Sequence, residues 1–245
     1  MSSKETKSKV KKTNKSTETK KQSINKDKLL LSIQNASYRY SDADIDEYAL
    51  KDVSYDFERG KIYAIRGRSG TGKTTLLSLI SGLERCTEGK IIFDGKDLKD
   101  INLDTYRNSQ IGIVFQSYNL LPFMTASENI ILSMDASGQK RENKKAKAIE
   151  LMKSVGLKES YADRKALRLS GGEQQRVAIA RSLSYNPKMI VADEPTGNLD
   201  KQTENEILDI FKKLAHEDDK CVIIVTHSAN VCDAVDEVYD LKKVK

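Results

Sequence analysis

The feature that most constrains the fold is a glycine-rich turn that joins a short apolar run to an amphipathic stretch. The turn reads Gly67-Arg68-Ser69-Gly70-Thr71-Gly72-Lys73-Thr74, with Thr75 next. Ile62–Arg66 before it is typical of a buried strand, and residues from Lys73 to about Ser81 are typical of a helix. The glycines let backbone N–H groups turn inward around a phosphate, and the helix N-terminus adds the positive end of its dipole. The sequence therefore predicts a strand, a phosphate-binding loop and a helix in succession.

Two side chains of this turn have chemistry that suits a nucleotide with its metal. Lys73 is placed to reach the β- and γ-phosphates, and Thr74 offers a hydroxyl to Mg²⁺. The alternative is a glycine-rich turn without a ligand. The strand before the turn and the helix after it favour the phosphate site.

Short apolar runs alternate with amphipathic stretches along most of the remaining chain. The runs typical of strands are Ile91–Phe93, Ile111–Phe115, Met189–Ala192 and Val222–Val225. Between the last two, residues 201–217 place Ile207, Ile210, Phe211 and Leu214 at helical spacing. This alternation predicts an α/β fold with a mostly parallel sheet.

The segment of about 117–170 has a different pattern, without a strong strand signal. Ala146–Val155 is helical by pattern, and Thr125 with Glu128 forms a candidate capping box. We interpret this segment as a helical subdomain inserted into the α/β core.

Positive charge is concentrated at the N-terminus of this 245-residue chain. Residues 1–28 contain ten lysines and three acids, whereas the rest contains 32 basic and 33 acidic residues. The first segment has too few apolar residues to offset its ordering entropy, so we expect a disordered tail before a folded domain over 29–245. The tail is interpreted as a solvated extension, with an anionic membrane surface or nucleic acid as alternative partners. No apolar run approaches the roughly 18–20 residues of a membrane span.

Two acids, Asp193 and Glu194, follow the apolar run Met189–Ala192. Ligands of α/β sheets bind beyond the carboxyl ends of the strands, which is where these carboxylates are expected. Asp193 would hold Mg²⁺ through water, and Glu194 would polarise an attacking water. The alternative is the start of a solvated acidic loop.

A second glycine-containing stretch occurs about a hundred residues after the first. It reads Leu169-Ser170-Gly171-Gly172-Glu173-Gln174-Gln175-Arg176. Ser170 and Glu173 have capping-box spacing, so one interpretation of the stretch is the start of a helix over Gln174–Leu183. A cap does not require the two glycines, however, and bare amides at a helix N-terminus suit an anion. The residues alone leave both interpretations open.

These eight residues resemble the signature motif of ATP-binding-cassette (ABC) proteins, and further motifs follow in the order of that family. Gln116 resembles the Q-loop, Asn198-Leu199-Asp200 the D-loop and Thr226-His227 the switch histidine. Tyr40 resembles the aromatic residue that stacks on adenine, with Tyr38 as a substitute. The resemblance covers about residues 29–240. One departure is Ser228, where many relatives have an acid after the histidine.

Within that family, two segments resemble the MacB/LolD/FtsE and bacitracin-exporter group. They are residues 111–122, followed by Thr125 and Glu128-Asn129, and residues 192–200. The resemblance implies a P-loop NTPase of the ABC-ATPase fold. Such a fold has a RecA-like, mostly parallel core, an antiparallel β subdomain and an inserted helical subdomain.

The resemblance also implies a head-to-tail homodimer that encloses two ATP molecules with Mg²⁺. One copy would bind ATP through Tyr40, Gly67, Arg68, Ser69, Gly70, Thr71, Gly72, Lys73, Thr74 and Thr75. The other copy would cover it with Ser170, Gly171, Gly172, Glu173 and Asp200. Thr74, Gln116 and Asp193 would serve the metal, and Glu194, His227 and Gln116 would act in hydrolysis.

The implied partner is a membrane permease of the MacB/FtsX type, which places the chain peripherally at the cytoplasmic face of the membrane. The implied function is an ATP-hydrolysing subunit of a membrane transporter or mechanotransmission complex, and antimicrobial peptide, peptide or lipoprotein export are the implied outputs. The alternative is a soluble ABC ATPase that acts on nucleic acid or ribosomes. Such proteins usually carry two cassettes or a long coiled-coil insertion, which this sequence does not have. No nucleic-acid partner is therefore expected.

Overall fold

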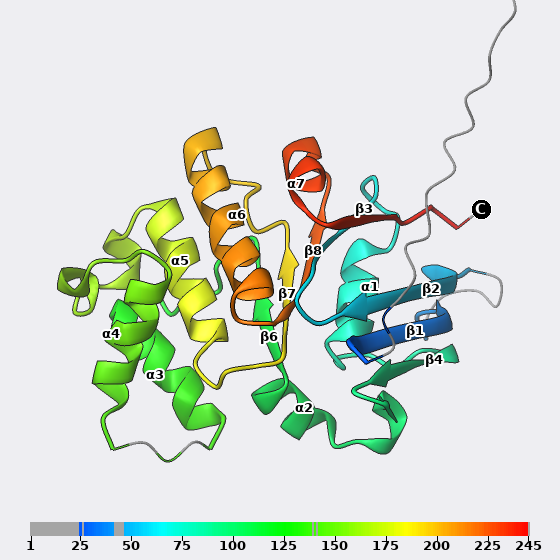
Figure 1. The fold of residues 1–245 in the computed structure, drawn as a ribbon, viewed down its shortest axis with the longest axis horizontal. Helices are drawn as coiled ribbons and strands as arrows, with labels where there is room; N and C mark the ends of the chain where they lie inside the picture. Colours follow the sequence, from blue (N-terminus) through cyan, green and yellow to red (C-terminus); the bar gives the residue numbers. More distant parts are fainter. Residues whose placement is uncertain (1–24, 26, 42–46, 139, 141, 245) are drawn as a thin grey trace, which may run out of the picture.

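The computed structural model describes residues 25, 27–41, 47–138, 140 and 142–244. Figure 1 shows a parallel sheet in the middle of the molecule, a group of helices on one side and an antiparallel sheet on the other. The tail expected over residues 1–28 lies outside the described residues, apart from 25, 27 and 28.

The central sheet has five strands in the order β6-β7-β8-β3-β9, and every neighbouring pair is parallel. The strands are β3 (Ile62–Arg66), β6 (Ile111–Val114), β7 (Met189–Asp193), β8 (Cys221–Thr226) and β9 (Glu237–Asp240). The expected parallel sheet is confirmed, with one further strand, β9, at its edge.

Burial on both faces explains the continuous apolar runs of these strands. In β7, Ile190 and Ala192 pack into a core with the helical part, whereas Met189 and Val191 pack into a second core on the opposite face. Side chains alternate between faces along a strand, so a strand covered on both sides needs apolar residues throughout.

The second core is closed by a four-stranded antiparallel sheet of order β2-β1-β4-β5. Its strands are β1 (Leu29–Tyr38), β2 (Leu50–Glu58), β4 (Glu88–Phe93) and β5 (Lys96–Asp97). Helix α1 (Lys73–Ile80) lies in the same core through Leu76, Leu79 and Ile80. The antiparallel sheet that the resemblance implies is thus present.

The helical part consists of α3 (Ala126–Ala136), α4 (Lys144–Ser154) and α5 (Gly171–Ser182), and α3 packs against both others. Thr125 and Glu128 form the expected capping box at α3, with both hydrogen bonds present. The remaining helices are α2 (Leu103–Ser109), α6 (Lys201–His216) and α7 (Ala229–Ala234), with short 3-10 turns at Leu98–Asp100, Glu159–Tyr161 and Ala166–Arg168.

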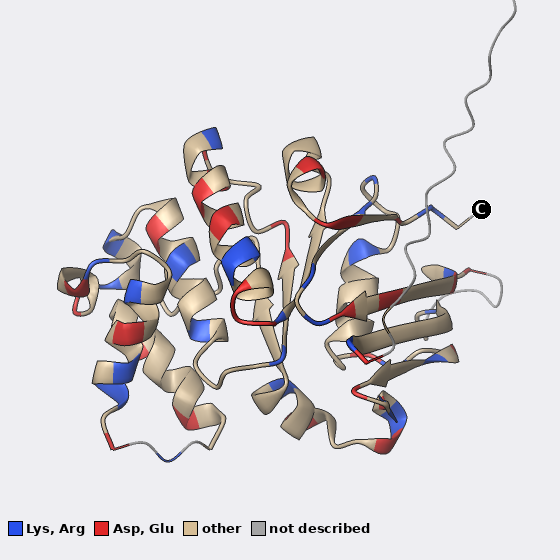
Figure 2. Cartoon of the chain, in the orientation of Figure 1, with Lys and Arg blue, Asp and Glu red and all other residues tan. Residues whose placement is uncertain are grey.

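Charges of both signs are interspersed over α2, α4, α5 and α6, whereas β6 and β8 of the central sheet carry none (Figure 2). Among the described residues, no helix combines the length and apolar character that crossing a bilayer requires.

Candidate functional site

The order of the parallel strands brings the predicted site residues to one edge of the sheet. Gln116 follows β6, Glu194 follows β7, His227 follows β8, and the glycine-rich turn 67–74 follows β3. Because these four strands are neighbours and parallel, their carboxyl ends lie side by side, where α/β folds bind ligands.

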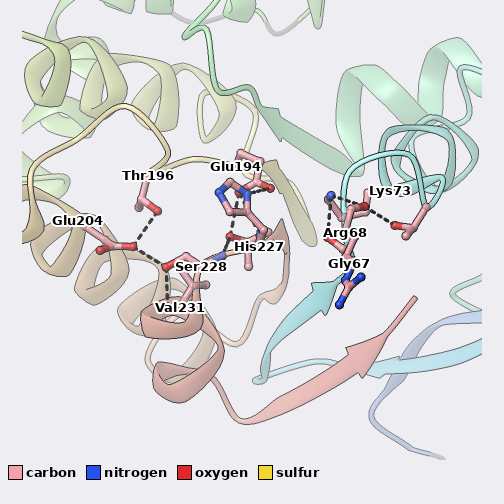
Figure 3. A network of polar contacts seen from close by, with 11 residues as sticks. Gly67, Arg68, Lys73, Glu194, Thr196, Glu204, His227, Ser228 and Val231 are labelled. Carbon is pink, nitrogen blue, oxygen red and sulfur yellow. Dashed lines mark hydrogen bonds and ion pairs between the residues drawn. The ribbon is translucent and has the colours of Figure 1, made fainter. Parts of the chain in front are cut away.

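The glycine-rich turn is held open by its glycines and by internal hydrogen bonds. Gly70 and Gly72 have φ values of 75° and 89°, a region that other residues rarely adopt. A Cβ on Gly72 would lie 2.5 Å from the carbonyl oxygen of Ala49. Lys73 Nζ donates to the carbonyl oxygens of Gly67 at 2.9 Å and Arg68 at 3.3 Å (Figure 3). The ammonium group therefore lies across the turn, as a phosphate contact requires.

The most closely joined side chains of the site are Glu194 and His227. His227 Nδ1 lies 2.7 Å from Glu194 Oε1, and Thr226 Oγ1 donates to Glu194 Oε2 at 2.9 Å (Figure 3). The Glu194 side chain is 12% exposed and that of His227 is 71% exposed. The carboxylate is thus held from two sides, while the imidazole faces outward into a hollow that Gly67, Arg68, Ser69 and Thr71 also line.

Glu194 also has an unusual backbone conformation. Its φ is 43°, and its N–H donates to the carbonyl oxygen of Val225 at 2.9 Å. A positive φ in a residue with a side chain costs free energy, and such positions concentrate at functional sites. The turn directs the Glu194 side chain toward the end of β8, where Thr226 and His227 contact its carboxylate.

Thr74, Gln116 and Asp193 offer a hydroxyl, an amide oxygen and a carboxylate, and oxygen ligands of this kind suit Mg²⁺. Burial raises the pKa of the Asp193 carboxyl, the charge of Glu194 raises it further, and Lys73 lowers it. Donors of these kinds are compatible with a divalent cation, whose charge would offset the unfavourable contributions of burial and of Glu194 to the ionised Asp193 carboxyl. Gln116 is exposed, and its amide lies close enough to Gly197 that a Cβ there would be 2.9 Å from Nε2.

Tyr40 lies at the other end of the glycine-rich turn, where its ring is 47% exposed. Its hydroxyl lies 3.0 Å from Oγ1 of Thr75, which is buried in α1. Tyr40 shares a hollow with Gly70 and Ala49, so a base stacked on the ring can connect to phosphates at the turn. Tyr38 is 7% exposed and packs edge-on against Tyr40, which leaves Tyr40 as the accessible ring.

The stretch Ser170–Glu173 forms the start of α5, three residues earlier than the expected helix start at Gln174. Glu173 N–H donates to Ser170 Oγ at 3.3 Å, and Ser170 N–H donates to Glu173 Oε2 at 2.8 Å, so the capping box is confirmed. The glycines also have a reason within the chain. A Cβ on Gly171 would lie 2.9 Å from the hydroxyl of Tyr118, and one on Gly172 would lie 2.5 Å from Cγ2 of Thr203.

Asp200 likewise has a partner in its own chain, at the start of α6. Its Oδ1 accepts from the N–H groups of Gln202 and Thr203, both at 3.0 Å, and its Oδ2 accepts from Thr203 Oγ1 at 2.6 Å. The hydrogen bonds from Thr203 lower the pKa of the Asp200 carboxyl. This side chain is an exposed, ionised helix cap.

Sequence reasoning missed two residues that join the site. Thr226 was noted only as the neighbour of His227, and Glu204 belongs to no motif. Glu204 Oε1 accepts from Thr196 Oγ1 at 3.2 Å and Ser228 Oγ at 3.0 Å (Figure 3). Only the packing of α6 against the loops after β7 and β8 reveals that contact.

Comparison with known proteins identifies the family of this chain. The family model of the ABC transporter matches residues 50–197. The uncharacterized ABC transporter ATP-binding protein YclH of Bacillus subtilis is 46% identical over 84% of this chain and 91% of its own length. The lipoprotein-releasing system ATP-binding protein LolD of Francisella tularensis is 39% identical over 87% of this chain and 94% of its own.

A solved structure is similar along nearly the whole described fold. It is the dimeric, post-hydrolysis state of the ATP-binding cassette MJ0796 of Methanocaldococcus jannaschii, bound to ADP and Pi. The TM-score is 0.79 at 38% identity, over 87% of this chain and 94% of that one.

The fold and the phosphate-binding edge define a nucleotide-hydrolysing protein. The chain belongs to the ABC transporter ATP-binding family. It is an ATPase with the ABC fold, and its homologues serve transporters.

Proposed function

We propose that this chain is the ATP-hydrolysing subunit of a membrane complex in which ATP closes a dimer of two copies and hydrolysis releases it. The observation that carries the proposal is that Lys73, the Glu194–His227 pair and Asp193 lie at one edge of the sheet. ATP would lie with its base on Tyr40 and its phosphates in the turn 67–74. The solved dimer of a similar cassette supports the pairing of two copies.

The chemistry follows from where the side chains lie. In this proposal Glu194 accepts a proton from the attacking water, with its carboxylate oriented by Thr226 and His227. Lys73 and the outward face of His227 stabilise the charge that develops on the transferred phosphoryl group. Thr74, Gln116 and Asp193 would hold Mg²⁺, which supplies further charge neutralisation at the phosphates.

The second copy completes the site in this proposal. Ser170, Gly171, Gly172 and Glu173 of the partner would cover the γ-phosphate with the N-terminus of α5, and Asp200 would lie nearby. A helix N-terminus stabilises an anion through its free N–H groups and its dipole.

A permease of the MacB/FtsX type is the proposed membrane partner, at the cytoplasmic face. The support is a group of exposed apolar side chains on the helical part. Leu121, Phe123 and Leu167 are 46%, 78% and 49% exposed, and Leu167 N–H donates to the carbonyl oxygen of Pro122 at 3.1 Å. Such a patch suits a protein contact. Given the likeness to LolD, lipoprotein or peptide export is the proposed output, and identifying the permease that co-purifies from the native membrane tests it.

The experiment that tests the ATPase mechanism is Glu194→Gln. The variant keeps the size of the side chain but cannot accept the proton. We expect MgATP binding to persist, a stable dimer to accumulate on size exclusion, and turnover to fall by roughly 10²–10⁴-fold. Near-normal hydrolysis in this variant would remove Glu194 from the role of general base.

A further inference from the structure

Glu204 joins the two loops that carry the proposed catalytic pair. Its Oε1 accepts from Thr196 Oγ1 at 3.2 Å and from Ser228 Oγ at 3.0 Å (Figure 3). Thr196 lies two residues after Glu194, and Ser228 directly follows His227. Thr196 is 5% exposed, so its hydroxyl needs a partner inside the protein, and the Glu204 carboxylate provides one.

The contact to Ser228 continues to the catalytic carboxylate. Ser228 N–H donates to Thr226 Oγ1 at 3.0 Å, and that hydroxyl donates to Glu194 Oε2 at 2.9 Å. Ser228 Oγ also accepts from Val231 N–H at 3.4 Å and so caps α7. Glu204 thus holds Ser228 in place, and Ser228 in turn holds the turn that carries Thr226 and His227.

Glu204 is also tied to the part of α6 that faces the proposed second copy. Its N–H donates to the carbonyl oxygen of Asp200 at 2.8 Å, one helical turn away. Asp200 caps the same helix, so α6 connects the Glu204 carboxylate to the helix end that the proposed second copy would contact. The helix is a rigid connection between the two.

We propose that Glu204 is a positioning residue, which aligns Glu194 and His227 through Thr196 and Ser228 and couples that alignment to the partner-facing start of α6. The inference rests on the proposed function, because it assumes the catalytic roles of Glu194 and His227.

Three variants and a double variant test this role. Glu204→Ala and Ser228→Ala each remove one side of the contact, and we expect each to lower kcat by about tenfold, below the roughly hundredfold loss that misplacement by 1 Å can cause. The KM for MgATP stays unchanged, since neither side chain contacts the nucleotide. The double variant loses no more than Glu204→Ala alone, because Ser228 acts through Glu204 in this proposal. Glu204→Gln keeps an acceptor oxygen of the same shape and retains most of the activity.

The matched control is Asp209→Asn, which removes a charge from an exposed position on the same helix. It keeps wild-type kcat and KM. Independent, additive losses in the double variant, an effect on KM alone, or an unchanged kcat in folded Glu204→Ala overturns the proposal. If Glu204→Ala does not fold, Ser228→Ala decides, because it removes the Ser228–Glu204 hydrogen bond with little change in shape, and an unchanged kcat in this variant overturns the proposal.

The same assay separates this inference from the proposed function beneath it. An active Glu194→Gln variant defeats the general-base mechanism whatever Glu204 does. An inactive Glu194→Gln together with normal Glu204 variants defeats the positioning role alone.

Discussion

The carboxylate of Asp94 is one of the groups that link the two sheets among the described residues. Asp94 lies in the turn between β4 and β5, where it accepts from Arg59 Nη2 at 2.9 Å and from Lys188 Nζ at 2.6 Å. Arg59 follows β2 and Lys188 precedes β7. The hydrogen bond from Lys188, then the charges of Lys188 and Arg59, hold the pKa of Asp94 below its usual value against the opposing effect of burial.

Asp94→Asn is therefore expected to destabilise the fold in a pH-dependent way. A carboxyl with a lowered pKa in the folded state adds stability above its unfolded pKa of about 3.9, and that stability is lost as the pH falls through the lower folded value. Asn tolerates the φ of 49° at this position, so the change removes charge without backbone strain.

Because Asp94 is 42% exposed, the effect at pH 7 should be less than about 1 kcal/mol, or a few degrees of Tm. Thermal melts of both proteins from pH 7 downward measure it. The difference shrinks as the carboxyl becomes protonated, and it shrinks in high salt. A Tm difference that depends on neither pH nor salt would contradict a stabilising role for the charge of Asp94.

At the scale of elements, the contact between α5 and α6 explains one glycine of the second glycine stretch. Gly172 lies in helical conformation, where alanine is normally favourable by about 1 kcal/mol. A Cβ there would nevertheless lie 2.5 Å from Cγ2 of Thr203 on α6, too close for a non-bonded contact.

Gly172→Ala should therefore lower stability, by about 1–3 kcal/mol if the clash forces the helices apart. Thr203→Ser removes Cγ2 but keeps the hydroxyl that donates to Asp200. In the double variant the clash is absent, and we expect Tm to return to the level of Thr203→Ser or above. Thermal unfolding of the four proteins measures this, and a double variant as unstable as Gly172→Ala alone would show that the clash is not the cause.

The elements differed in how far the sequence could predict them. Strands β3, β6, β7 and β8 were predictable because burial on both faces produces unbroken apolar runs, as at Cys221–Thr226. Strand β9 was missed because Glu237–Asp240 is only half-buried and mixes charged with apolar residues. The capping box at Ser170 was visible as spacing, whereas the need for glycine at 172 depends on Thr203, which only the packing of two helices brings near.

The same limit applies to the candidate site. Gln116, Glu194 and His227 end or follow strands, so a parallel sheet places them together whatever the details of packing. Glu204 lies inside a helix with no motif around it, and its role depends on the position of α6 relative to two loops. Sequence periodicity predicts that α6 packs on the sheet but does not fix which polar side chain reaches which loop.

At the scale of the whole molecule, the proposed second copy predicts a separation between binding and hydrolysis. Ser170→Arg places a long cation where the partner's γ-phosphate would lie. It should abolish the ATP-dependent dimer and turnover, while the isolated copy still binds a fluorescent ATP analogue with unchanged affinity. Size exclusion in the Glu194→Gln background provides the dimer readout.

Ser170→Ala is the matched control for the lost helix cap. It removes the hydroxyl that caps α5 without adding bulk, so it should cost about 1 kcal/mol of stability but still permit closure. If Ser170→Arg instead abolishes ATP binding by the single copy, the residue acts within its own chain and the proposal of a shared site fails.

The helix caps at Ser170 and Asp200 bear on how two copies form and leave the closed dimer. Both side chains are hydrogen-bonded within their own helices, so this part of the surface has its final conformation before a second copy binds. These two helix starts therefore need not fold during docking, which keeps the entropy that they lose on association small. Nucleotide occupancy, not the remodelling of a loop, would set the lifetime of the closed pair.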